Sequence, residues 1–70
     1  MADLPFTLDQ LRILRAIVSE GSFKKAADSL FVTQPAVSHT LRSLEKKLGV
    51  KLFQRRAEGM VPTAPGEHLL

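Results

Sequence analysis

The chain has 70 residues, enough for one small domain whose helices must share a single core. It contains no cysteine, which excludes disulfides and thiolate metal sites. No apolar stretch approaches the roughly 20 residues of a membrane span. Because the opening residues Met1–Pro5 lack the basic start and apolar run of a signal peptide, we expect a cytoplasmic protein.

The net charge of +3 is unevenly distributed along the chain. Residues 33–56 contain six Lys or Arg and one Asp or Glu, a net +5, whereas residues 1–32 are neutral and residues 57–70 carry −2. A basic middle segment indicates a polyanionic partner. The alternative is a solvated helix face followed by a loop.

A first helix is predicted after Thr7, because Thr7 and Gln10 have the spacing of a capping box. Gly21 is expected to end it, as a residue that adopts positive φ just past a helix end. The apolar stripe expected to face the core consists of Leu8, Leu11, Leu14 and Val18.

A short second helix is predicted after Ser22, which can cap it. Its apolar positions are Phe23, Ala26, Ala27 and Leu30. A helix of about two turns is not stable alone, so its neighbours must hold it in place.

A third helix is predicted after a tight break at Phe31-Val32, with Thr33 as its cap and Pro35 in its first turn. Gly49 is expected to end it. Its stripe is the clearest in the chain and consists of Val37, Leu41, Leu44 and Leu48.

A β-hairpin, or wing, is predicted next. A short strand is expected at 50–54, a turn at 55–59 that includes Gly59, and a second strand at Met60-Val61 that Pro62 ends. Thr63 and Pro65 are typical of the start of a fourth helix. The expected fold class is therefore mainly α, a winged helix-turn-helix with a three-helix core, a two-stranded wing and the start of a further helix.

Two helices joined by a short break are a helix-turn-helix candidate, in which the second helix enters the DNA major groove. No acid lies on the face of the third helix opposite its stripe, because Glu45 falls off to the side. This face carries Pro35, His39, Arg42 and Lys46, with Gln34 and Ser38 on its flank.

The chemistry of this face suits the reading of bases. Gln34 can bond adenine with both amide atoms, and His39 and Arg42 can donate to guanine. Pro35 can contact a thymine methyl group. The expected base-reading residues are Thr33, Gln34, Pro35, Ser38, His39 and Arg42.

A second set of residues is suited to phosphates. Lys24 and Lys25 lie in the first turn of the short helix, where the helix dipole disfavours cations. A DNA phosphate at that N-terminus, with Ser22 as a donor, would reverse the effect, although two solvated lysines are the alternative. The expected phosphate or wing contacts are Ser22, Lys24, Lys25, Lys46, Lys51, Arg55 and Arg56.

From about Phe6 to Leu70 the sequence resembles LysR-type transcriptional regulators, through many residues at fixed spacings. The matching residues are Gly21-Ser22-Phe23, Ala26-Ala27, Leu30, Thr33–Ser38, Leu44-Glu45, Leu48-Gly49, Leu52-Phe53, Arg55, Thr63 and Gly66. The opening Asp3–Leu8 is similar to cyanobacterial members linked to carbon assimilation. The family often has Leu-Thr-x-Ala-Gly where this chain has Pro62–Gly66, which leaves the exact start of the fourth helix open.

The resemblance implies a DNA-binding domain at 1–62, with the helix-turn-helix at about 23–48 and the wing at about 50–62. Residues 63–70 would begin a linker helix through which homodimers or dimers of dimers form. Such regulators bind double-stranded DNA at inverted repeats near promoters, at the bacterial nucleoid. A co-inducer would bind a C-terminal domain outside these 70 residues, and no cofactor is expected within them. Base contacts in the family most often come from the positions of Gln34, Pro35, Ser38 and His39, and a wing contact from that of Arg55.

The sequence disfavours two other functions. Ser38 and His39 are adjacent, so they point about 100° apart on a helix and cannot act as a nucleophile and its base. His39 and His68 lack carboxylates at ligand spacing, so neither an enzyme nor a metal site is expected. A winged helix that binds protein would not need a donor-rich, acid-free face.

Overall fold

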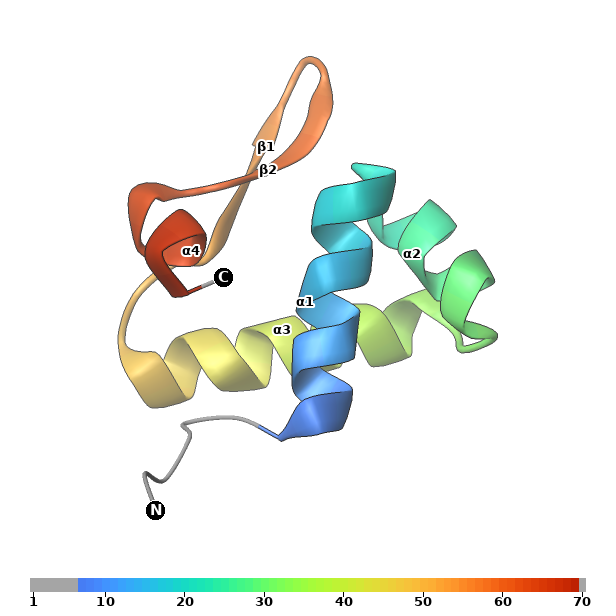
Figure 1. Ribbon diagram of the computed structural model, residues 1–70, viewed down its shortest axis with the longest axis horizontal. Coiled ribbons are helices and arrows are strands. Elements are labelled where there is room, and N and C mark those ends of the chain that lie inside the picture. The colour runs from blue at the N-terminus through green and yellow to red at the C-terminus, as the bar shows by residue number, and fades with distance from the viewer. Residues whose placement is uncertain (1–6, 70) are drawn as a thin grey trace.

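The computed structural model describes residues 7–69, which fold as three helices, a hairpin and a short fourth helix. The outer limits of the expected domains, at residues 1 and 70, lie outside this part of the chain. Figure 1 shows α1 crossing α3, with α2 beside one end of α3 and the hairpin and α4 beside the other. This order and arrangement confirm the expected winged helix-turn-helix.

Helix α1 spans Leu8–Glu20 and begins as its sequence predicts. The Gln10 backbone N–H donates to Thr7 Oγ1 at 3.1 Å, and the Thr7 backbone N–H donates to Gln10 Oε1 at 2.8 Å. This capping box satisfies donors that the helix itself leaves unpaired. Gly21 ends the helix in the left-handed conformation, also as expected.

The stripe expected on α1 was partly wrong. Leu8 is 73% exposed and Val18 is 45% exposed, whereas Leu14 and Ile17 are buried. The helix carries apolar residues at adjoining positions, so two stripes pass through Leu14 and periodicity does not choose between them. Packing against α2 and α3 decides in favour of Ile17, with Ile13 and Ala16 at its margin.

Helices α2 (Phe23–Leu30) and α3 (Gln34–Leu48) have the predicted limits. Ser22 and Thr33 cap them, and Gly49 ends α3. Phe31 ends α2 in the left-handed conformation, at a φ of 59°, and its backbone N–H bonds to carbonyls of the last turn. This tight turn sets the angle between the two helices.

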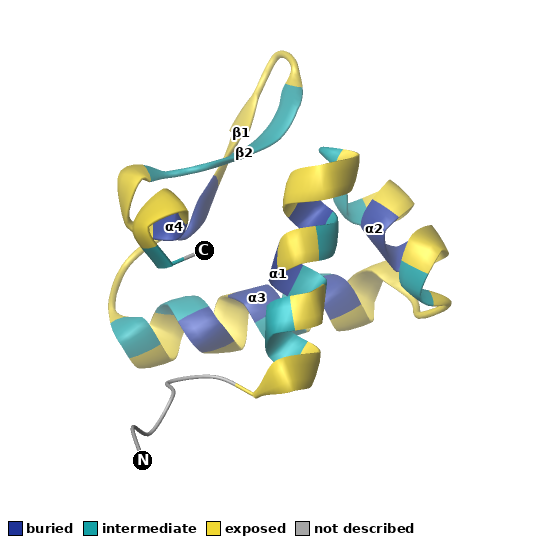
Figure 2. Cartoon of the chain, viewed as in Figure 1, coloured by how far each residue is buried: buried dark blue, intermediate teal, exposed yellow. Residues whose placement is uncertain are grey.

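One core joins the three helices to the start of the hairpin. Figure 2 shows the buried bands of α1, α2 and α3 where the helices meet. Ala26 and Ala27 are buried to 2% exposure or less, and their small size lets α2 approach its neighbours closely. The buried residues are Leu14, Ile17, Ala26, Ala27, Val37, Leu41, Leu44, Leu52 and Phe53.

The wing consists of strands β1 (Phe53–Arg56) and β2 (Gly59–Pro62), paired antiparallel with Phe53 opposite Pro62 and Arg56 opposite Gly59. The expected first strand at 50–54 was therefore placed about three residues too early, and Arg55 and Arg56 lie in the strand rather than in the turn. The strand pairing begins only at Phe53 because the backbone N–H of Leu52 bonds to a side chain instead of to the opposite strand. Leu52 C=O still accepts from Thr63 N–H at 2.9 Å, in the register of the hairpin, but Leu52 N–H donates to the Glu45 carboxylate.

Helix α4 spans Ala64–Leu69 and begins one residue after Thr63. Thr63 acts as its cap, because Thr63 Oγ1 accepts from the Gly66 backbone N–H at 3.2 Å. Gly66 is buried against the Leu52 carbonyl, and a Cβ at this position would overlap that carbonyl. Close backbone approach at Gly66 thus fixes α4 to the segment between α3 and β1.

Candidate nucleic-acid interface

The outer face of α3 is open to solvent. Ser38 is half-buried, whereas the side chains of Gln34, Pro35, His39, Arg42 and Lys46 are exposed. Within residues 7–69, no hydrogen bond or ion pair is recorded for any of these six side chains. Their donors and charges are therefore available to a partner.

The opposite face of α3 fixes how this outer face is presented. Val37, Leu41 and Leu44 are between 0% and 4% exposed and pack in the core. Because these three positions lie on one side of the helix, their burial sets its rotation. Thr33 stands at the start of the face, with its hydroxyl accepting from the Ala36 backbone N–H at 3.2 Å.

The N-terminus of α2 lies near the wing. The Met60 backbone N–H donates to the Gly21 carbonyl at 2.9 Å, which ties β2 to the residue before Ser22. Arg56 is paired with Gly59, the neighbour of Met60, so it comes from the same end of the wing. The fold thus brings together two sets of residues that are predicted to contact phosphates and that lie about thirty residues apart in the chain.

The cations at α2 are solvated. Lys24 Nζ lies 3.3 Å from an Asp28 carboxylate oxygen, with both side chains largely exposed. Lys25 is exposed, and its backbone N–H donates to Ser22 Oγ at 3.0 Å. The Lys24–Asp28 pair was not anticipated from the sequence, although its i, i+4 spacing is typical of such pairs.

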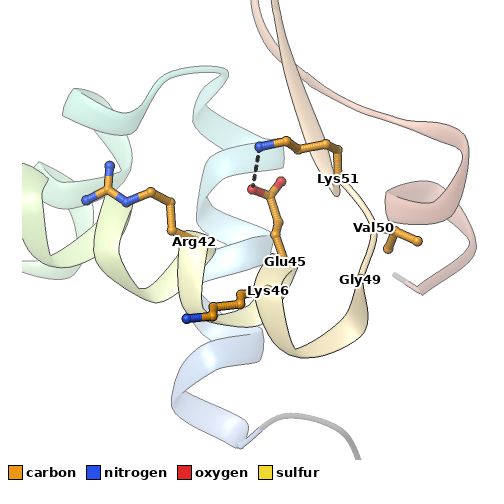
Figure 3. A pocket seen from close by; sticks show the side chains of 6 residues that line it. All are labelled: Arg42, Glu45, Lys46, Gly49, Val50 and Lys51. Carbon is orange, nitrogen blue, oxygen red and sulfur yellow. Dashed lines mark ion pairs between the residues drawn. The ribbon is translucent and has the colours of Figure 1, made fainter.

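A shallow hollow of about 350 Å³ lies where α3 meets the segment leading to β1. Figure 3 shows the side chains that line it. Three are basic, and the fourth charged residue is Glu45. Lys51 Nζ lies 3.8 Å from Glu45 Oε1, and the Lys51 side chain remains 81% exposed.

Glu45 is a residue whose role the sequence analysis missed. Its side chain is only 10% exposed, and its Oε2 accepts from the Leu52 backbone N–H at 2.8 Å and from that of Phe53 at 3.4 Å. The available signal was that Glu45 is the single acid in the most basic segment of the chain. Its helical position predicts that Glu45 lies away from the outer face of α3, but helical position alone does not predict which groups it contacts.

Other kinds of site find little support in the part of the chain that is described. Across residues 7–69, no three His, Asp or Glu side chains gather closely enough to hold a metal ion. Nor does any helix there combine the length and apolar character needed to cross a membrane.

A family model described as "Bacterial regulatory helix-turn-helix protein, lysR family" matches residues 8–67. The chain belongs to the LysR family. The matched range runs from the first residue of α1 into α4, so it includes the helix-turn-helix and the whole wing.

Curated LysR relatives of this chain are named "Probable RuBisCO transcriptional regulator". Those of Guillardia theta and of Synechocystis sp. are each 60% identical to it over 70 residues. These 70 residues span 23% and 20% of the two relatives, respectively. The chain therefore corresponds to about a fifth of the length of such regulators.

Solved LysR structures share the fold. A crystal structure of the CbnR DNA-binding domain with DNA has a TM-score of 0.85 at 34% identity, over 93% of this chain and 75% of that one. A complex of the BenM DNA-binding domain with benA site 1 DNA has a TM-score of 0.83 at 38% identity, over 90% of this chain and 71% of that one. OxyR of Corynebacterium glutamicum has a TM-score of 0.87 at 38% identity, over all of this chain and 22% of that one.

Proposed function

We propose that this LysR-family chain binds double-stranded DNA sequence-specifically and so regulates transcription, as a binding module and not as an enzyme. Helix α3 would enter the major groove, and the wing would lie on the backbone or in the minor groove. Residues 1–62 would form the DNA-binding domain, and residues 63–70 would begin the linker helix.

The observation that carries this proposal is the solvent-exposed outer face of α3. Gln34, His39 and Arg42 point away from a helix whose other side is firmly buried, and no acid interrupts them. An α-helix fits the major groove, and these side chains match the hydrogen-bonding groups of base edges. Thr33, Pro35 and Ser38 would complete the base-reading set.

Phosphate contacts would come from both sides of that helix. Ser22, Lys24 and Lys25 would meet the backbone at the α2 N-terminus, where unpaired N–H groups and the helix dipole favour an anion. The other contacts to the DNA backbone would come from basic residues of α3, of the segment after it and of the wing. They are Lys46, Lys51, Arg55 and Arg56. Support comes from the two similar DNA-binding domains whose structures contain DNA.

The full-length protein would act as a homodimer or a dimer of dimers at inverted-repeat half-sites near a promoter, in the cytoplasm at the nucleoid. A C-terminal domain beyond this chain would bind a small-molecule co-inducer; curated relatives, at about four to five times the length of this chain, have room for such a domain. We further propose RuBisCO genes as targets, since the DNA-binding regions are 60% identical to regulators carrying that name.

The test is a selection of bound duplexes from a random pool, followed by measurement of affinity at several salt concentrations. We expect enrichment of one half-site sequence and a steep fall of affinity with salt, since each phosphate contact adds about −0.9 to the log–log slope. No enrichment together with a flat salt response would refute DNA recognition and favour a protein partner for the winged helix.

A further inference from the structure

Glu45 joins α3 to the wing through backbone amides. Its Oε2 accepts from the N–H groups of Leu52 and Phe53, at 2.8 and 3.4 Å. Leu52 and Phe53 are buried, so in this place water could not easily replace the carboxylate. A carboxylate is a strong acceptor for two such donors.

The location of this acid is unusual for a protein that binds a polyanion. Residues 33–56 carry a net +5, and Glu45 is their single acid. Were its carboxylate free, it would repel phosphates that approach Arg42 and Lys46 on the same helix. The structure instead turns Oε2 to the backbone and Oε1 toward Lys51, which leaves the side chain 10% exposed (Figure 3).

The wing has other attachments, both near its turn and at its base. Near the turn, Met60 N–H bonds to Gly21. At the base, Leu52 and Phe53 pack in the core, and Thr63 bonds to the backbone of Lys51 and Leu52. Within residues 7–69, the side-chain hydrogen bonds that join α3 to the start of β1 are those of Glu45. Its carboxylate thus joins the core packing of Phe53 and the Met60–Gly21 bond in setting where β1, and with it Arg55, stands relative to the outer face of α3.

From these contacts we infer that Glu45 is a positioning residue for DNA binding, which holds β1 to α3 so that the wing and α3 meet one duplex together. The inference rests on the proposed function, because it assigns to Glu45 the coupling of two DNA-contacting elements. Oε2 does the holding, so an uncharged oxygen at the same place can replace it.

A double-mutant cycle tests this coupling. Arg55→Ala is made in the wild type, in Glu45→Ala and in Glu45→Gln, and affinity for the selected duplex is measured below the melting temperature of every variant. We expect Arg55→Ala to weaken binding about tenfold in the wild type but less than about twofold in Glu45→Ala, where β1 has lost its hydrogen bonds to α3. In Glu45→Gln, whose amide oxygen can still accept, the loss should return to about tenfold.

The controls separate positioning from charge and from stability. Glu67→Gln removes one negative charge at an exposed position of α4 outside the hollow, and it should leave the Arg55→Ala effect unchanged. If Glu45→Ala does not fold, Glu45→Met, which fills similar space without an acceptor, takes its place. Equal effects of Arg55→Ala in all backgrounds would overturn the inference.

Hydrogen exchange provides a readout that needs no DNA. The amides of Leu52 and Phe53 should exchange at least about tenfold faster in Glu45→Ala than in the wild type, and at near wild-type rates in Glu45→Gln. Unchanged exchange in Glu45→Ala would refute the role of the carboxylate. Failure of the wild type to bind any duplex, with the exchange result as expected, would refute the proposed function and the role of Glu45 in DNA binding, but not its attachment of β1 to α3.

Discussion

Side-chain oxygens decide where the helices of this protein begin. Thr7, Ser22, Thr33 and Thr63 each precede a helix, and each accepts the backbone N–H of the residue three positions later. The first three caps were predictable because the capping residue and its helix are adjacent in sequence. The contacts of Glu45 were not predictable, because this side chain bonds to amides seven and eight residues away, across a turn.

At Gly66 a methyl group should be destabilising. In most helices Gly→Ala stabilises by about 1 kcal/mol, but here the added Cβ meets the Leu52 carbonyl. We expect Gly66→Ala to lower the free energy of unfolding by about 1–3 kcal/mol, as measured by urea denaturation. Ser43→Ala, at an exposed helical position, serves as the control and should change little. A stabilised Gly66→Ala would show that α4 does not approach so closely.

At His39 the expected effect is on sequence preference. His39 is exposed on the outer face of α3 and, within the described residues, has no recorded hydrogen bond. His39→Ala should leave stability nearly unchanged and reduce discrimination between the selected and a random duplex by about 1–3 kcal/mol. Competition binding with the two duplexes measures this. An equal loss of affinity for both would mean that His39 reads no base.

At the scale of elements, the clarity of each apolar pattern determined how well its buried face was predicted. In α3 the predicted stripe is the buried one, with Leu48 at its edge, because polar residues separate the apolar positions. In α1 apolar residues adjoin one another, and tertiary packing chose between two stripes. The start of β1 was predicted too early for a similar reason, since the Leu52 N–H before it bonds to Glu45 of another element.

Two leucine substitutions compare the predicted stripes of α3 and α1. Leu44 is 1% exposed, so Leu44→Ala should leave a cavity and cost about 2–5 kcal/mol of stability. Leu8 is 73% exposed, so Leu8→Ala should change stability by less than about 0.5 kcal/mol. Thermal or urea unfolding measures both. Equal losses in the two variants would contradict the rotation of α1 seen here.

At the scale of the whole molecule, the fold gathers basic groups that the sequence keeps apart. The bond from Met60 to Gly21 brings the wing to the start of α2, while Glu45 holds the other strand to α3. The proposed phosphate contacts thus flank the proposed base-reading face within one fold. Preorganisation of this kind reduces the entropy lost on binding.

The salt dependence of DNA binding tests this arrangement. Arg56→Ala should weaken binding to all duplexes alike and flatten the log–log salt slope by about 0.9 if Arg56 contacts one phosphate. Arg15→Ala removes the same charge from an exposed position of α1 and is the matched control. A slope that does not differ between Arg56→Ala and Arg15→Ala would place Arg56 away from the backbone.

The sequence alone determined the helices, their caps, the turn between α2 and α3 and the basic character of residues 33–56, because these depend on neighbours within a few positions. The tertiary structure decided which stripe of α1 is buried, where β1 begins, and that Glu45 faces the backbone rather than solvent. Each of these depends on groups brought together across a turn or from another helix, and local periodicity carries no information about such contacts.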